Sequence, residues 1–258
     1  MNYKQKTIQK AKALLKESDL LDLIAQGQFD EFIERLAKVA QSSKNLLYLA
    51  TPKQGDLSVL YQDNLDKQAF CQAFVDLIYG AGPSPELLGK YVTWLKERQF
   101  PNKWTFPTFF LFVCHPETEM FVKPSTSQWF LKFVGALETL PSSPDQEIYS
   151  KLLQYCKQLW DGLQTYKPRD YVDVQGFIWA AFSANQSKGK LAKPFNKMFK
   201  DWEEAHWAFD LLQTAAGYFA LQRPNDSLLA LTCAYVPGGQ RIRFNYGNWL
   251  VMGINGKA

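Results

Sequence analysis

The sequence predicts an α+β fold that is predominantly helical, with two antiparallel β-hairpins that could join one sheet. Two observations support this class. Apolar residues recur at intervals of three and four from Lys4 to Glu97, and the period changes to two after Pro101. The composition, 47% apolar and 21% charged, is typical of globular proteins and excludes whole-chain disorder, collagen or coiled coil.

The first part of the chain is predicted to form several short helices. Asn64 can cap one helix, which Gly80 and Gly82 end. Ser84 and Pro85 can begin the next, because proline is tolerated in a first helical turn. The apolar positions on which these helices depend are Phe29, Phe32, Ile33, Leu36, Ala40, Phe70, Phe74, Leu77, Ile78, Leu88, Val92 and Leu95.

The first hairpin is predicted between residues 105 and 123. Thr105–Cys114 and Met120–Lys123 are rich in strand formers, and His115–Glu119 is a turn-forming linker between them. The first strand would carry apolar residues on both faces, with Phe106 on one and Phe109 on the other. We therefore expect a strand that is covered on both sides.

Helices are predicted again from residue 143 onward. Ser143 can cap a helix that runs to about Leu163, and Asp170 or Asp173 can cap the next. Ser183–Lys190 has the polar composition of a loop, and a further helix is predicted over Phe195–Leu221.

The second hairpin is predicted at the C-terminal end. Leu228–Val236 and Gln240–Ile254 flank Pro237, Gly238 and Gly239, and glycines supply the positive φ that a tight connection needs. These elements predict a mainly helical region with a central hairpin over residues 1–185, followed by a basic helix and the C-terminal hairpin over residues 186–258. One continuous domain is the alternative.

Positive charge is concentrated in the last third of the chain. The net charge is +4, but Gln186–Lys200 holds five lysines and Ser227–Ala258 holds two arginines and one lysine, with no acid in either. These side chains could neutralise phosphates and make nucleic-acid binding depend on salt. A solvated surface is the alternative. The candidate nucleic-acid-binding residues are Lys188, Lys190, Lys193, Lys197, Lys200, Arg241 and Arg243.

Residues for catalysis and cofactor binding are scarce. The cysteines Cys71, Cys114, Cys156 and Cys233 are widely separated, which predicts reduced, buried thiols and no metal. The sequence has no phosphate-binding glycine loop and no His-Glu-x-x-His motif. We therefore expect no cofactor and no catalytic residue. With no signal-peptide pattern and no apolar run of roughly 20 residues, a cytoplasmic protein without a membrane partner is predicted.

Three stretches carry a resemblance to a known family. They are KWTFPTFFLFV at Lys103–Val113 with MFVKP at Met120–Pro124, PRDYVDVQGFIW at Pro168–Trp179, and a short box at residues 45–47. Together they resemble an uncharacterised module found beside, or fused to, the AAA+ ATPases of McrB-like modification-dependent restriction systems. Gly176 stands where that pattern has serine. The resemblance implies a role in antiviral defence beside a partner ATPase or nuclease subunit.

The middle stretch contains a candidate pocket. Gln175 and Trp179 are four residues apart and share a helix face, while Asp173 lies near the helix start. Trp179 could stack on a base whose edge bonds Gln175, as in proteins that read bases. A buried polar hinge between packed elements is the alternative.

The leading hypothesis is a non-catalytic DNA-recognition or scaffold component of a prokaryotic defence system. The second is a protein-interaction subunit, because aromatic residues form 15% of the chain and dominate binding hot spots. The third is a metal-dependent nuclease that uses Asp170 and Asp173.

Overall fold

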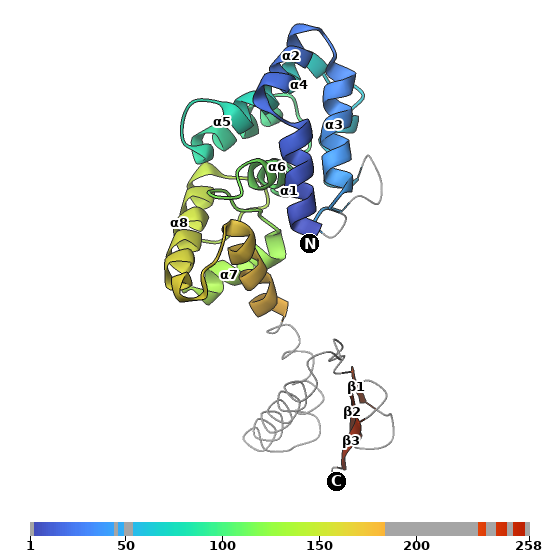
Figure 1. Cartoon of the computed structure of the whole chain (residues 1–258), viewed down its shortest axis with the longest axis vertical. Coiled ribbons are helices and arrows are strands. Elements are labelled where there is room, and N and C mark those ends of the chain that lie inside the picture. Colours follow the sequence, from blue (N-terminus) through green and yellow to red (C-terminus); the bar gives the residue numbers. More distant parts are fainter. Residues whose placement is uncertain are drawn as a thin grey trace. The chain divides into compact units, whose positions relative to one another are not determined.

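The computed structural model describes residues 3–43, 46–48 and 54–183, and the backbone of three strands between residues 232 and 255 (Figure 1). The chain divides into two compact units, Met1–Ala180 and Ala181–Ala258. The predicted boundary at residue 185 and the predicted helix over Phe195–Leu221 lie outside the described residues. The α-helices are α1 (Tyr3–Leu14), α2 (Glu17–Ala25), α3 (Phe29–Gln41), α4 (Lys67–Tyr79), α5 (Ser84–Glu97), α6 (Thr105–Cys114), α7 (Pro124–Phe133) and α8 (Gln146–Gly162).

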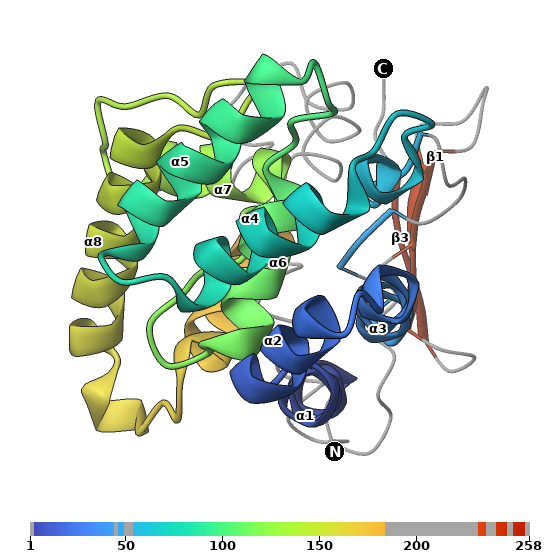
Figure 2. The same cartoon turned by 90° about the horizontal axis from the view of Figure 1, so that it is seen from above.

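Three shorter helical segments accompany these α-helices. Two are 3-10 helices, η1 (Ser58–Tyr61) and η2 (Gln164–Tyr166). Residues 171–183 are also helical and follow η2 closely. The helix α1 lies beside α3, and both views show this pairing (Figures 1 and 2).

The helix α6 occupies the core, where the sequence predicted a strand. Every residue from Thr105 to Val113 is buried, and α6 packs against α1 and α4. Thr108 Oγ1 donates to the Trp104 carbonyl at 2.6 Å, and Pro107 lies in the first turn, where no helical N–H is lost. The first predicted hairpin is therefore wrong. Because the run is apolar throughout, it carries no periodicity that separates a strand from a buried helix.

The segment after α6 is also different from the prediction. Met120, Phe121 and Val122 are buried, but they belong to no strand. The backbone N–H of Val122 donates to Thr108 Oγ1 at 3.1 Å, so a side chain of α6 satisfies a group that a neighbouring strand would otherwise satisfy.

The starts of α4 and α5 follow local rules that the sequence displays. The Asp66 carboxylate accepts a hydrogen bond from the backbone N–H of Ala69, so the cap lies two residues after the predicted Asn64. The helix ends at Tyr79, immediately before Gly80, as predicted. The helix α5 begins at Ser84 with proline in its first turn, which confirms that prediction.

The later helices also begin at side-chain caps. Asp145 accepts from the backbone N–H groups of Glu147 and Ile148, two residues after the predicted cap Ser143. Asp170 accepts from the N–H of Val172 at 3.0 Å, so Asp170 caps the helix of residues 171–183.

Much of the aromatic content lies in the core. The rings of Phe74 and Phe110 meet edge to face with centroids 5.1 Å apart, and Phe32 meets Phe74 in the same way at 5.8 Å. Phe106 joins them at 5.1 Å from Phe110. Each such pair contributes about 0.5–1.5 kcal/mol beyond its burial. These rings stabilise the fold and are buried away from any partner.

The three strands belong to the second unit. They are β1 (Thr232–Tyr235), β2 (Arg241–Tyr246) and β3 (Leu250–Asn255), and their backbones pair antiparallel in that order. The single strand predicted over Gln240–Ile254 is thus two strands. The predicted α+β class with two hairpins is wrong, because residues 3–43, 46–48 and 54–183 are mainly helical and contain no strand.

Within the described ranges, no helix has both the length and the apolar character required to span a membrane. The helix α6 is almost entirely apolar but has only 10 residues.

Candidate functional site

The candidate nucleic-acid-binding residues lie in the second unit. The five lysines from Lys188 to Lys200 are outside the described residues. Arg241 and Arg243 lie on β2, where Arg241 pairs with Asn255 and Arg243 pairs with Ala234 and Gly253. Only the backbone is described there, so whether these cations form one surface stays a prediction.

The three residues of the predicted pocket have different environments. Gln175 is buried, and its side-chain oxygen accepts a hydrogen bond from the Lys4 ammonium on α1. Trp179 is 43% exposed, and the Lys123 amine lies 5.1 Å from the centroid of its ring. Such a cation–π contact is worth about 0.5–1 kcal/mol at an exposed site. Gln175 thus joins two packed elements, while Trp179 keeps part of its ring in water.

Asp173 is committed to Arg169. Its carboxylate accepts from Arg169 Nη2 at 2.7 Å, from Nε at 3.0 Å and from the backbone N–H of the same residue at 3.0 Å. These hydrogen bonds hold the pKa of Asp173 below its ordinary value. The acid is therefore ionised at neutral pH and is oriented by an arginine fork.

Lys4 is the least expected residue of this region. Its side chain is buried where the first turn of α1 packs against the start of the helix of residues 171–183. Burial lowers the pKa of Lys4 to about 8, and the charges of Asp173 and Asp170 oppose that change. Gln5 adds a second link, because its amide donates to Asp170 Oδ2 at 3.4 Å. A buried, charged contact thus fixes α1 to residues 170–175.

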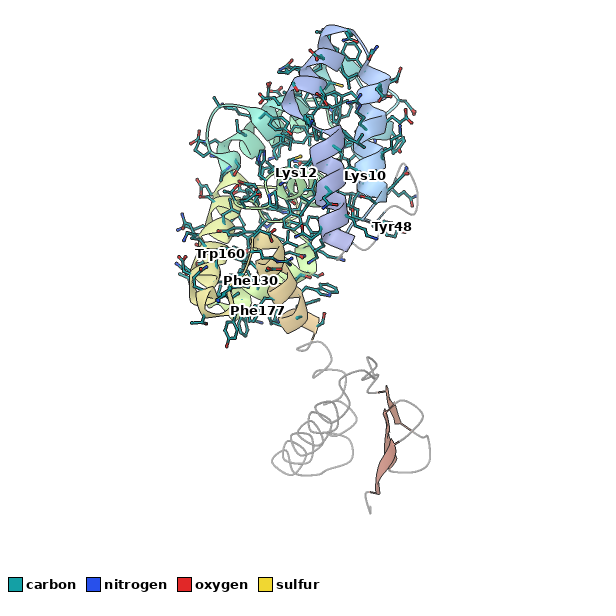
Figure 3. All side chains as sticks on the ribbon, viewed as in Figure 1. Lys10, Lys12, Tyr48, Phe130, Trp160 and Phe177 are labelled. Atoms are coloured by element: carbon teal, nitrogen blue, oxygen red, sulfur yellow. The ribbon has the colours of Figure 1, made fainter. Side chains whose placement is uncertain are left out.

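The outer face of α1 carries the described positive surface that the sequence reasoning missed. On α1, Lys6 and Lys12 are exposed and Lys10 is partly exposed, while Ile8 and Ala11 are buried; the exposed Lys16 follows just after the helix. Lys12 makes one long ion pair, 3.8 Å, with Glu117. Figure 3 shows Lys10 and Lys12 along α1. The signal was present in the sequence, because residues 1–16 contain five lysines and no acid.

The described thiols are protonated at neutral pH. Burial raises the pKa of Cys71 and of Cys114 to about 12, and it raises the pKa of Cys156 further. A thiol in this state is a poor nucleophile. His115 Nε2 lies 2.8 Å from the carbonyl oxygen of Ile78, which can only accept, so this nitrogen is the ring N–H donor. His206, the other histidine, lies outside the described residues.

A buried carboxylate was also missed by the sequence reasoning. Glu119 is 6% exposed and accepts from Ser84 Oγ at 2.7 Å and from the Tyr149 hydroxyl at 2.9 Å. The Tyr149 hydroxyl in turn accepts from the backbone N–H of Met120 at 3.3 Å. This network ties α5 and α8 to the segment after α6. No local sequence pattern marks it.

In the described part of the chain, no three His, Cys, Asp or Glu side chains form a group that could hold a metal ion. Asp170 instead caps the helix of residues 171–183, and Asp173 accepts hydrogen bonds from Arg169.

Comparison with protein-family models, curated proteins and solved structures finds no match. The resemblance to the restriction-system module therefore stays a prediction, and the candidate site rests on its own geometry.

Proposed function

We propose that this protein is a non-catalytic nucleic-acid recognition or scaffold component of a prokaryotic defence system, beside a partner ATPase or nuclease subunit. The lysine face, defined as Lys6, Lys10 and Lys12 on α1 together with Lys16 just after that helix, carries the proposal. The resemblance of Lys103–Val113 and Pro168–Trp179 to the restriction-associated module supports the defence context. Because restriction systems act on DNA, this context favours DNA as the nucleic acid that the lysine face binds.

The lysine face is both concentrated and held in place. The helical region is neutral over residues 1–185, with 20 basic and 20 acidic residues, so a positive face must come from local segregation. Neighbouring charges on α3 cancel in pairs, since Arg35 contacts Glu31 and Lys38 contacts Glu34, both at 2.9 Å. The buried contact of Lys4 anchors the first turn of α1, so the lysines are presented on a docked helix.

The expected affinity follows from the number of phosphates that can be neutralised. Three lysines on α1 and Lys16 just after it can release about three to four counterions, which gives a slope of about −3 in log affinity against log salt. This interaction alone is weak and independent of base sequence. The cations predicted in the second unit would add to it if they face the same ligand.

The test compares two matched triple variants in the full chain. Lys6→Gln, Lys10→Gln and Lys16→Gln remove three of the four charges of the lysine face, while Lys90→Gln, Lys96→Gln and Lys167→Gln remove the same charge from exposed sites elsewhere. Fluorescence anisotropy with labelled duplex and single-stranded DNA, from 50 to 200 mM salt, measures binding. We expect the first variant to lose at least about tenfold in affinity at 100 mM salt and to flatten the slope by about 2–3.

The control variant should bind within about twofold of the unmodified protein. If both triple variants lose the same affinity for DNA, the loss reflects net charge and not the lysine face. If the unmodified protein shows no detectable binding, the proposal is overturned. Replacing Lys188, Lys190, Lys193 and Lys197 with Glu tests the predicted second cationic segment separately.

A protein-interaction subunit is the second candidate function. One observation favours it: large apolar side chains at the C-terminal end of α7 are in water, with Phe133 66% exposed and Leu137 97% exposed. Burial of such side chains by a partner is the main favourable contribution in most protein associations.

A further inference from the structure

The C-terminal end of α7 and the turn after it form an exposed apolar projection, which we call the α7 knob. It consists of the exposed side chains of Phe133, Val134 and Leu137, and the partly buried Trp129 packs against the core beneath them. The rings of Trp129 and Phe133 are stacked, with centroids 4.9 Å apart and planes 21° from parallel. Phe130 and Leu131, on the inner side of the same helix, are buried in the core. The knob is thus the outer side of a helix whose inner side is already packed.

The knob is a fixed structure. The backbone N–H of Val134 donates to the Phe130 carbonyl, and that of Ala136 donates to the Leu131 carbonyl at 2.9 Å. Gly135 has a φ of +73°, which closes the helix in the conformation that glycine adopts most easily. Beyond the knob, the N–H of Leu140 donates to Gln128 Oε1 at 2.8 Å. Leu137 is therefore held in water between two anchored points.

Holding an apolar side chain rigidly in water has a thermodynamic consequence. A flexible loop loses conformational freedom when it binds, but the knob has already lost that freedom on folding. More of the free energy of burial is therefore available for binding. Stacked aromatic rings beside an aliphatic residue are also typical of the centres of binding hot spots. These properties favour a partner that packs apolar side chains against the knob.

The charges around the knob define the chemistry of that partner. Lys132 is exposed within the knob. Lys151 is exposed on α8, one turn before Tyr155, whose hydroxyl donates to Glu138 at 3.1 Å and so brings α8 beside the turn. Glu138 lies directly after Leu137, and its carboxylate accepts the Tyr155 hydrogen bond. Lys132 follows Leu131 directly before Phe133, and Lys151 lies on the face of α8 that Tyr155 shares, so acidic groups on a partner would complement them.

The same charges argue against two other occupants of the knob, a second copy of this chain and a lipid surface. A twofold contact between two copies of this chain through the knob would bring both copies of Lys132 into one interface, and like charges gathered there are unfavourable. Insertion into a lipid surface would carry the Glu138 carboxylate, adjacent to Leu137, toward the acyl chains, which would require its desolvation.

We infer that the α7 knob is the docking surface for a different protein that offers a peptide segment with apolar anchors flanked by acidic residues. This inference rests on the protein-interaction candidate and is independent of nucleic-acid binding by α1. It specifies the surface and the chemical class of the partner.

The experiment uses the full chain and a displayed library of random 16-residue peptides as the probe. Selection on the unmodified protein is expected to enrich peptides with Leu, Phe or Trp anchors and with Asp and Glu. Synthetic copies of the enriched peptides should lose at least tenfold in affinity for the double variant Phe133→Ser and Leu137→Ser. Leu21→Ser, at an exposed position of α2, is the matched control and should bind as the unmodified protein does.

A charge reversal makes the test specific. The variant Lys132→Glu and Lys151→Glu should bind the acidic peptides at least tenfold more weakly and should bind versions with Lys in place of Asp and Glu more tightly. Thermal unfolding of each variant checks that its fold is kept, since all four positions are exposed. Absence of enrichment, or equal binding by the double variant, would overturn the inference.

The alternative occupants give distinct results. A dimer of the full chain in sedimentation that disappears in the double variant would assign the knob to a second copy. Knob-dependent binding to vesicles of neutral and anionic phospholipid would assign it to a membrane. A further outcome is a protein partner that forms a stoichiometric complex at high salt and binds the double variant as tightly as the unmodified protein. That result would support the interaction function and overturn the assignment to the knob.

Discussion

The pH dependence of stability should report the burial of Lys4. The pKa of Lys4 falls from its ordinary value of 10.5 to about 8 in the folded protein, because burial penalises the ammonium more than the charges of Asp173 and Asp170 compensate. Between these two values the folded state binds fewer protons at this site than the unfolded state. The free energy of unfolding must therefore rise as the pH increases through this window.

The magnitude follows from the two pKa values. One pH unit corresponds to about 1.4 kcal/mol, so the rise between pH 8 and pH 10.5 is at most about 3 kcal/mol. Water reaches part of the ammonium and reduces this value, so we expect about 1–2 kcal/mol. The variant Lys4→Met removes the titrating group and should remove that rise, although it leaves the Gln175 oxygen unpaired at every pH.

Urea unfolding at several pH values from 7 to 10.5, followed by tryptophan fluorescence, measures the effect. The difference between the unmodified protein and Lys4→Met isolates this site, because other groups that titrate over the same range contribute equally to both. Lys6→Met is the matched control, since Lys6 is exposed on the same helix. If the unmodified protein and Lys4→Met show the same pH dependence, or if Lys6→Met removes the rise equally, the assignment of a buried amine is wrong.

Substitutions at three positions test other buried or capping groups, each by chemical denaturation at pH 7. Tyr91→Phe should leave the free energy of unfolding unchanged or raise it, because the buried Tyr91 hydroxyl has no hydrogen-bond partner among the described residues; a loss above about 1 kcal/mol would reveal a partner. Tyr149→Phe should cost about 2–3 kcal/mol, since it removes a donor from the buried Glu119 carboxylate, and an unchanged midpoint would contradict that network. Asp145→Ala should cost about 1 kcal/mol through the lost cap of α8, whereas Asp145→Asn should keep most of the stability.

Local chemistry was sufficient to predict where several helices begin and end. Ser84 with the following proline, Gly80 and Asp170 act through backbone groups within a few residues, so their effect is readable in the sequence. Cap positions were less certain, because Asn64 and Ser143 are good caps in isolation but Asp66 and Asp145 are the residues used. The segregation of lysines in the first 16 residues was likewise present in the sequence alone.

Tertiary packing decided the features that depend on distant residues. Thr105–Cys114 is a helix because it is surrounded by other helices, and an unbroken apolar run is compatible with either conformation until its neighbours are known. Lys4 is buried while Lys6 is exposed because Gln175, 171 positions away, meets one of them and not the other. The exposure of Leu137 depends in the same way on which neighbours cover α7. Periodicity and capping act over one or two turns of chain, whereas burial is set by contacts between segments that no local pattern relates.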